Sequence, residues 1–149
     1  MAHLVGIACR PARRAAVTTM DEGRIDASAG LVGDHRQRPG RRQVSVLTAE
    51  GWEAACAELG IALPWTLRRA NLLVAGLDLR GRVGHRLVLG EAVLEITGEL
   101  DPCRRMDDAH PGLMAALVPS WRGGATCRVV TGGRIRAGDG VDLLLPDAR

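Results

Sequence analysis

Short apolar segments interrupted by glycine at close intervals are the feature that most constrains the fold of this chain. Within these segments apolar residues alternate with polar ones or run together briefly, a pattern typical of β-strands. The expected strands cover residues 4–8, 43–47, 71–75, 86–89, 92–97, 127–131, 134–136 and 141–145. Gly90 and the pair Gly132-Gly133 are expected to form the turns of two β-hairpins. Many short strands predict a mainly β domain, either a barrel or a sandwich, with few helices.

One helix is well marked. Thr48 is a suitable N-cap for a helix that runs through Leu59 and ends at Gly60. Its apolar residues follow the helical spacing i, i+3, i+4 and i+7. They are Trp52, Ala55, Cys56 and Leu59. Cys56 is therefore expected to be a core residue.

Composition sets the class of protein. The 149 residues match the usual size of one domain, so residues 1–149 are expected to fold as a single unit. The sequence has no Phe or Tyr and only three Trp, so Leu, Val, Ile and Ala must build the core. Arg carries all the positive charge, because the sequence has no Lys. A GC-rich genome would produce this bias, since arginine codons are rich in G and C. The net charge of +3 is too small to indicate nucleic acid by itself.

The four cysteines bear on the cellular compartment. None of Cys9, Cys56, Cys103 and Cys127 forms a CxxC pair. The N-terminus has no basic leader followed by a long apolar run, and no segment approaches the length of a transmembrane helix. We therefore expect free thiols in a reducing cytoplasm and no membrane partner. Cys9 and Cys127 fall within strand patterns and are expected in the core.

The segment around Cys103 is the most informative stretch. Asp101 is a suitable N-cap and Pro102 a suitable first helical residue, which would place Cys103 in the first turn of a helix broken at Pro111. The helix dipole and the neighbouring Arg104 and Arg105 would then favour a thiolate. The alternative is that Cys103 is an ordinary small residue of a capped helix.

Residues 30–42 are expected to form a long surface loop. Gly30 and Gly33 suit tight turns, and Asp34 and His35 are followed by four arginines. These are Arg36, Arg38, Arg41 and Arg42. The loop is either an anion cradle or a solvated loop in an arginine-rich protein. His35 is a candidate acid, base or ligand near neutral pH.

A second polar group stands at the entrance of the strand expected over residues 71–75. Arg68, Arg69 and Asn71 offer donors for a phosphate, a carboxylate or the edge of a pterin. Taken in order, these and other segments resemble the MOSC family, which is named after the C-terminal part of molybdenum cofactor sulfurases, a pyridoxal phosphate-associated family. The matching segments are Gly30-Leu31-Val32-Gly33-Asp34, Arg42-Gln43-Val44-Ser45, Arg69-Ala70-Asn71-Leu72, Gly76-Leu77-Asp78-Leu79, Val83-Gly84, Gly90-Glu91-Ala92-Val93-Leu94-Glu95, Pro102-Cys103-Arg104-Arg105-Met106, Gly132-Gly133-Arg134-Ile135 and Gly138-Asp139.

The resemblance implies a free-standing MOSC domain with a compact barrel of the pyruvate-kinase-barrel type and a few helices. It implies that Cys103 carries sulfur as a persulfide or ligates molybdenum. Arg69 and Asn71 match a polar pair near the cofactor or anion pocket, although Ala70 stands where many relatives have Glu. Arg42 and Arg104 would help Arg69 hold the phosphate of the molybdenum cofactor (molybdopterin), and Asp34 and His35 belong to the same expected site.

Three functions follow as hypotheses. The first is a cofactor-binding or sulfur-carrier protein that receives sulfur from a donor such as a cysteine desulfurase. The second is a cofactor-dependent reductase of N-hydroxylated compounds, which needs a separate electron-donor protein because the sequence has no iron–sulfur or flavin motif. The third is a nucleic-acid-binding barrel, which the scarcity of aromatic residues disfavours, so no nucleic acid is expected as partner.

Overall fold

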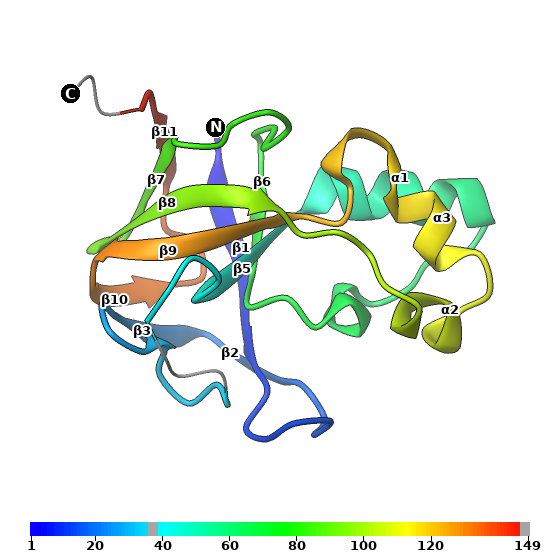
Figure 1. The fold of residues 1–149 in the computed structure, drawn as a ribbon, viewed down its shortest axis with the longest axis horizontal. Helices are drawn as coiled ribbons and strands as arrows, with labels where there is room; N and C mark the ends of the chain where they lie inside the picture. The colour runs from blue at the N-terminus through cyan, green and yellow to red at the C-terminus, as the bar shows by residue number, and fades with distance from the viewer. Residues whose placement is uncertain (36–38, 147–149) are drawn as a thin grey trace.

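The chain folds into two β-sheets with helices gathered on one side (Figure 1). A computed structural model describes residues 1–35 and 39–146. Its strands are β1 (His3–Cys9), β2 (Thr18–Met20), β3 (Glu22–Asp26), β4 (Gly30–Leu31), β5 (Val44–Thr48), β6 (Leu72–Ala75), β7 (Arg86–Leu89), β8 (Ala92–Glu99), β9 (Ala125–Thr131), β10 (Gly133–Arg136) and β11 (Val141–Leu144). Its helices are α1 (Ala49–Leu59), α2 (Arg105–Ala109) and α3 (Leu113–Leu117), with short 3-10 turns η1 (Trp65–Arg68) and η2 (Pro119–Trp121). The expected mainly β fold with few helices is confirmed.

The larger sheet curls toward closure without completing a barrel. Its strand order is β11-β7-β8-β9-β5-β6-β1-β2, and a separate sheet has the order β10-β3-β4. Near β11, the backbone N–H of Leu4 donates to the carbonyl of Asp139 at 2.8 Å. The N–H of Val141 donates to the carbonyl of Ala2 at 3.0 Å. These bonds bring the β11 end of the sheet next to β1 through a few contacts rather than a full ladder.

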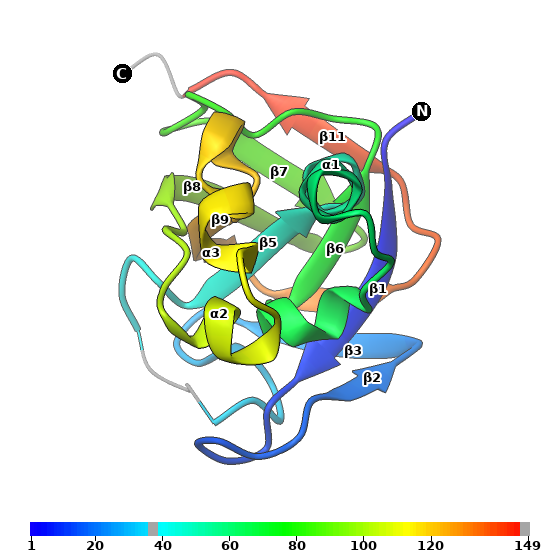
Figure 2. The same cartoon turned by 90° about the vertical axis from the view of Figure 1, so that its right-hand side faces the viewer.

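A β-α-β unit joins the sheet to the helices. β5 and β6 are parallel, with Val46 opposite Leu72, and α1 connects them. Both faces of these strands are buried, as parallel strands require. Val46 and Leu72 face the core between the sheets, whereas Leu47 and Leu73 face the core under the helices. Figure 2 shows α1, α2 and α3 in front of this part of the sheet.

Local signals placed α1 correctly. The Thr48 side chain accepts a hydrogen bond from the N–H of Gly51 at 3.0 Å, and Gly60 ends the helix with a left-handed φ of 67°. Cys56 packs in the core under the helices, as expected. α1 is the longest helix over residues 1–35 and 39–146, and none there is long and apolar enough to cross a membrane.

The second expected hairpin is wrong. β7 and β8 do form a hairpin around Gly90, but β9 and β10 do not pair with each other. β9 pairs with β8 along its length and with β5 only over residues 125–127. β10 instead pairs with β3, a strand that lies within a polar segment.

The helix start at Asp101 is also wrong. α2 begins at Arg105, and Arg104 occupies the cap position with no side-chain hydrogen bond. The Arg68 guanidinium donates to the carbonyls of Leu100 and Asp101 at 2.8 and 3.3 Å, so these carbonyls are bonded to a side chain rather than to the N–H groups of a helix. The interruption at Pro111 is confirmed, because His110 is extended and α3 starts at Leu113.

Candidate functional site

One cavity collects residues from distant parts of the sequence. It lies where β1 ends, where β5 and β6 begin and where the chain leaves β8. Its volume is about 210 Å³. The lining residues are Arg10, Arg42, Val44, Ser45, Arg68, Arg69, Asn71, Leu100, Asp101, Cys103, Arg105, Met106 and Thr126. Five arginines and one aspartate among them give this cavity a net positive lining, which would suit an anion.

Cys103 is the exposed thiol at this cavity. It lies two residues before α2, not in its first turn, so the expected support from a helix dipole is absent. Its carbonyl accepts the N–H of Met106 at 2.9 Å, which fixes the turn into the helix. The other three cysteines are buried and free, as expected for Cys9 and Cys127. Burial raises the pKa of Cys127 to about 12.

Arg68 forms the buried floor of the cavity. Its Nε donates to the carbonyl of Gly123 at 2.9 Å, in addition to the bonds to Leu100 and Asp101. Burial lowers the pKa of this guanidinium, whereas the nearby Cys103 and Asp101 act to raise it. Arg68 therefore ties η1 to the chain that carries Cys103 and brings a positive charge close to the thiol.

Arg69 adds a second charge beside it. It adopts a left-handed φ of 64° at the end of η1, and its Nη1 donates to the carbonyl of Ala15 at 2.8 Å. Burial lowers the pKa of Arg69, and repulsion from Arg105 and Arg10 lowers it further. Three guanidinium groups thus lie close enough to disfavour one another, and a bound anion would offset this repulsion.

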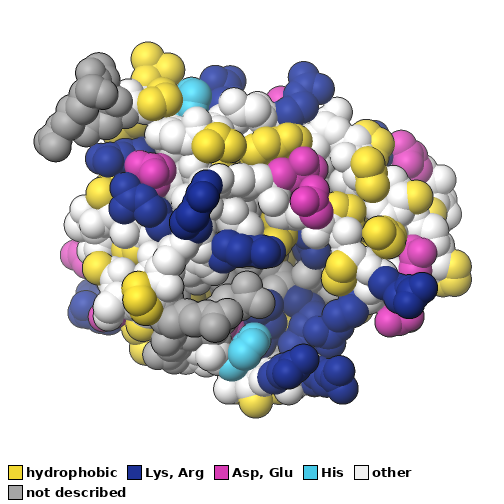
Figure 3. All heavy atoms as spheres, in the orientation of Figure 1, with side chains coloured by type: hydrophobic (Ala, Val, Ile, Leu, Met, Phe, Trp, Pro, Cys, Tyr) yellow, Lys and Arg dark blue, Asp and Glu magenta, His cyan; other side chains and the backbone are white. Residues whose placement is uncertain are grey.

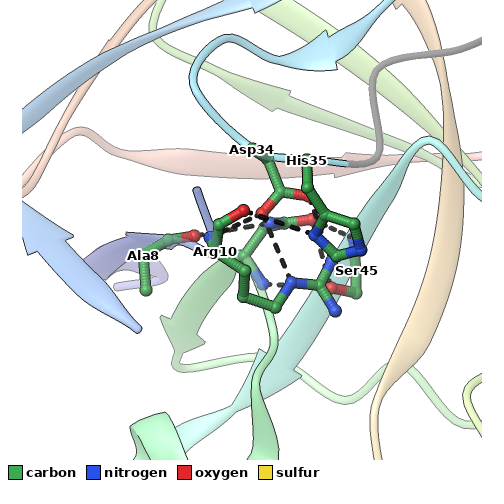
Figure 4. A network of polar contacts seen from close by, with 6 residues as sticks. Ala8, Arg10, Asp34, His35 and Ser45 are labelled. Carbon is green, nitrogen blue, oxygen red and sulfur yellow. Dashed lines mark hydrogen bonds and ion pairs between the residues drawn. The ribbon is translucent and has the colours of Figure 1, made fainter. Parts of the chain in front are cut away.

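Arg10 is held in place by Asp34 (Figure 4). Asp34 is buried, and its carboxylate accepts hydrogen bonds from the backbone N–H of Arg10 at 2.7 Å and from its guanidinium Nε and Nη2 at 3.3 and 3.1 Å. His35 is exposed, and its backbone N–H donates to the carbonyl of Arg10 at 2.7 Å. Asp34 and His35 are therefore supports behind Arg10 and do not line the cavity.

Asn71 lines the cavity but directs its polar atoms toward the sheet. Its Oδ1 accepts from the N–H and hydroxyl of Ser45 at 3.0 and 3.2 Å, and its Nδ2 donates to the carbonyl of Ala8 at 3.3 Å. The Asn71 N–H donates to the Ser45 hydroxyl at 3.0 Å. These bonds join β1, β5 and the start of β6 where the cavity opens.

The remaining predicted residues divide between the cavity and its surroundings. Arg42 lines the cavity and is exposed, whereas Arg104 is exposed before α2 and does not line it. Arg36 and Arg38 lie outside the described residues.

The sequence reasoning missed one arginine of the cavity, Arg10, and placed a second, Arg105, beside Cys103 but not among the residues that hold the cofactor. Arg10 was not singled out, because it follows a strand end and its carboxylate partner Asp34 is far away in the sequence, so no local signal marks it. Arg105 was not assigned to the cavity side, because two adjacent arginines cannot be told apart before the helix start is known.

The basic character of this face is visible on the surface. Figure 3 shows several Arg side chains gathered on the lower part of the face in view, with few acidic side chains among them. Guanidinium forks pair well with phosphate and carboxylate oxygens. An exposed thiol at the edge of such a cavity combines a soft nucleophile with an anion site.

The chain belongs to the MOSC domain family, because the family's sequence profile matches residues 17–142. Among solved structures, it is similar to the YUAD protein from Bacillus subtilis, with a TM-score of 0.82, 22% identity and coverage of 99% of this chain and 98% of that one. For YiiM from Geobacillus stearothermophilus the TM-score is 0.76 and the identity 16%, with coverage of 97% of this chain and 75% of that one. For YiiM from Escherichia coli the TM-score is 0.72 and the identity 16%, with coverage of 99% of this chain and 72% of that one. No curated protein matches the sequence.

Proposed function

We propose that this protein binds the molybdenum cofactor or carries sulfur, with Cys103 as the reacting group. The observation that carries the proposal is the exposed Cys103 thiol at the edge of a cavity lined by five arginines. Membership of the MOSC family supports the same direction, since these domains are generally associated with functions related to this cofactor.

The residues present fit the chemistry of the group. A thiolate is a soft ligand suited to molybdenum, and arginines suit a phosphate. Cys103 would hold the metal, and three arginines would hold the phosphate: Arg42, Arg69 and Arg105. Asn71 would support the site through its hydrogen bond with Ser45. When bound, the cofactor would supply two-electron redox or sulfur-transfer chemistry. The chain itself supplies binding, charge and the positioned thiol.

Sulfur transfer needs only the thiol and a donor. The Cys103 thiolate attacks the outer sulfur of a donor persulfide. A bond forms between Cys103 Sγ and that sulfur, the S–S bond of the donor breaks, and the donor leaves as a thiolate. The Arg68 guanidinium, whose charge interacts with Cys103, stabilises the negative sulfur before and after transfer.

The test compares the wild type with Cys103→Ser, both expressed where cofactor synthesis is intact. We expect bound molybdenum and pterin in the wild type and loss of most of the molybdenum in Cys103→Ser. Mass spectrometry after exposure to a persulfide donor should find an added sulfur on Cys103. Cys56→Ala is the control, because it removes a buried thiol that does not line the cavity. If the wild type carries neither cofactor nor persulfide, the proposal is wrong.

A further inference from the structure

A second hollow adjoins the cavity that Cys103 borders. It has a volume of about 480 Å³ and lies between the chain after β1, η1 and α2. Its lining residues are Ala16, Val17, Thr66, Leu67, Arg69, Arg105, Met106, Asp108 and Ala109. Arg69, Arg105 and Met106 line both spaces, so they form the border between them.

The hollow has an apolar wall and a cationic border. Val17, Leu67 and Met106 supply apolar surface from three separate segments, and Thr66 adds a hydroxyl group. Arg69 and Arg105 stand together at one side. Such a combination suits a ligand with an apolar body and an anionic end.

Within residues 1–35 and 39–146, no carboxylate lies within 4.0 Å of either arginine, since the ion pairs there involve other arginines. Asp108 follows Arg105 by three residues on α2 and lines the same hollow, yet these two described side chains do not form an ion pair. Arg69 is nevertheless held in position, because its Nη1 is bonded to the carbonyl of Ala15 at 2.8 Å.

We propose that this second hollow binds a small organic monocarboxylate, with its carboxylate on Arg69 and Arg105 and its apolar body against Val17, Leu67 and Met106. A carboxylate accepts two parallel hydrogen bonds from a guanidinium fork and would relieve the repulsion between the two arginines. Asp108 also lines the hollow, and its charge opposes each negative charge on the ligand, so a ligand with one carboxylate is favoured over a ligand with two. This site shares Arg69 and Arg105 with the proposed cofactor site but does not require Cys103.

Benzoate is the probe, with benzamide as its neutral counterpart and inorganic phosphate as an anion without an apolar body. Titrations followed by NMR should show benzoate binding at least tenfold more tightly than benzamide, with shifts at Val17 and Leu67. Arg105→Leu should weaken benzoate binding at least tenfold. Arg105→Lys should retain part of it, because the charge stays while the fork is lost. Ala109→Trp should block benzoate by filling the hollow and leave phosphate binding unchanged.

Arg104→Leu is the matched control, since Arg104 adjoins Arg105 in sequence, is exposed and lines neither space. Circular dichroism and melting temperature would verify that each variant is folded. The inference is overturned if benzamide binds as tightly as benzoate, or if Arg104→Leu weakens benzoate as much as Arg105→Leu. Cys103→Ser should bind benzoate like the wild type, so failure of this site and failure of the proposed function are separate results.

Discussion

Asn71 shows how a single buried side chain joins the segments that form the cavity. It is buried, and its amide group joins Ser45 on β5 to Ala8 on β1. The sequence and the family resemblance pointed to Asn71 as a cofactor-binding residue, and the structure places its amide atoms on protein partners. A buried polar group that loses its partner costs free energy, so the role of Asn71 can be measured as stability.

We predict that Asn71→Ala lowers the free energy of unfolding by about 2–3 kcal/mol, because the N–H of Ser45 and the carbonyl of Ala8 lose their side-chain partner. Urea denaturation followed by circular dichroism measures the change. Ser28→Ala serves as a control for loss of a side-chain hydrogen bond at an exposed turn. Equal effects of the two substitutions would contradict the structural role assigned to Asn71.

Glu99 gives a prediction for pH. Burial raises the pKa of Glu99, and the nearby Asp101 raises it further. The folded state therefore binds a proton more readily than the unfolded state, so stability falls as pH rises from the ordinary glutamate pKa through the raised value. Glu99→Gln should be more stable than the wild type at pH 7, with the difference disappearing at pH values below the ordinary glutamate pKa.

Thermal melts of both proteins across this pH range provide the measurement. Glu53→Gln, on the exposed surface of α1, is the matched control. A Glu99→Gln protein that is less stable than the wild type at pH 7 would show that the surroundings stabilise the carboxylate, contrary to the raised pKa of Glu99.

Elements differ in how far the sequence alone predicts them. α1 has its cap, its apolar stripe and its terminating glycine within one continuous segment, and all three were correctly predicted. β10 was assigned to the wrong partner because its pairing with β3 depends on which strand edges the rest of the sheet leaves open. β2, β3 and β4 were missed, since they are short or polar and have no local signal.

The end of α1 supports a prediction about backbone geometry. Gly60 has a φ of 67°, and a Cβ added there would meet no atom within 4 Å. Gly60→Ala should therefore lower stability by about 1 kcal/mol through backbone strain alone. Gly140→Ala is the matched control, because that position is equally open but its φ lies outside the left-handed region. A loss in Gly140→Ala as large as in Gly60→Ala would show that the left-handed φ of Gly60 does not set the cost.

At the scale of the whole molecule, the cavity exists only because the sheet brings distant segments together. Arg10, Arg42, Arg69 and Arg105 come from four separate parts of the chain. Periodicity predicts strands and helices but not which arginines meet. The ordered set of family motifs indicated Arg42, Arg69 and Cys103 for the site, the polar segment before the strand indicated Arg68, and the fold added Arg10. Which member of the adjacent pair 104–105 faces the cavity depends on where α2 begins.

Clustering positive charge at the meeting point of several strands means that an anion bound there should stabilise the entire fold. A ligand at one hundred times its Kd adds about 2.7 kcal/mol, which is about 5 to 10 °C in melting temperature for a domain of this size. We predict such a rise with inorganic phosphate, compared with sodium chloride at equal ionic strength. Arg42→Ala should reduce the rise, because Arg42 is an exposed arginine that lines the cavity. Arg24→Ala should not, because Arg24 is exposed on β3 and does not line it. If chloride and phosphate raise the melting temperature equally, the effect is general screening and the arginines do not form an anion site.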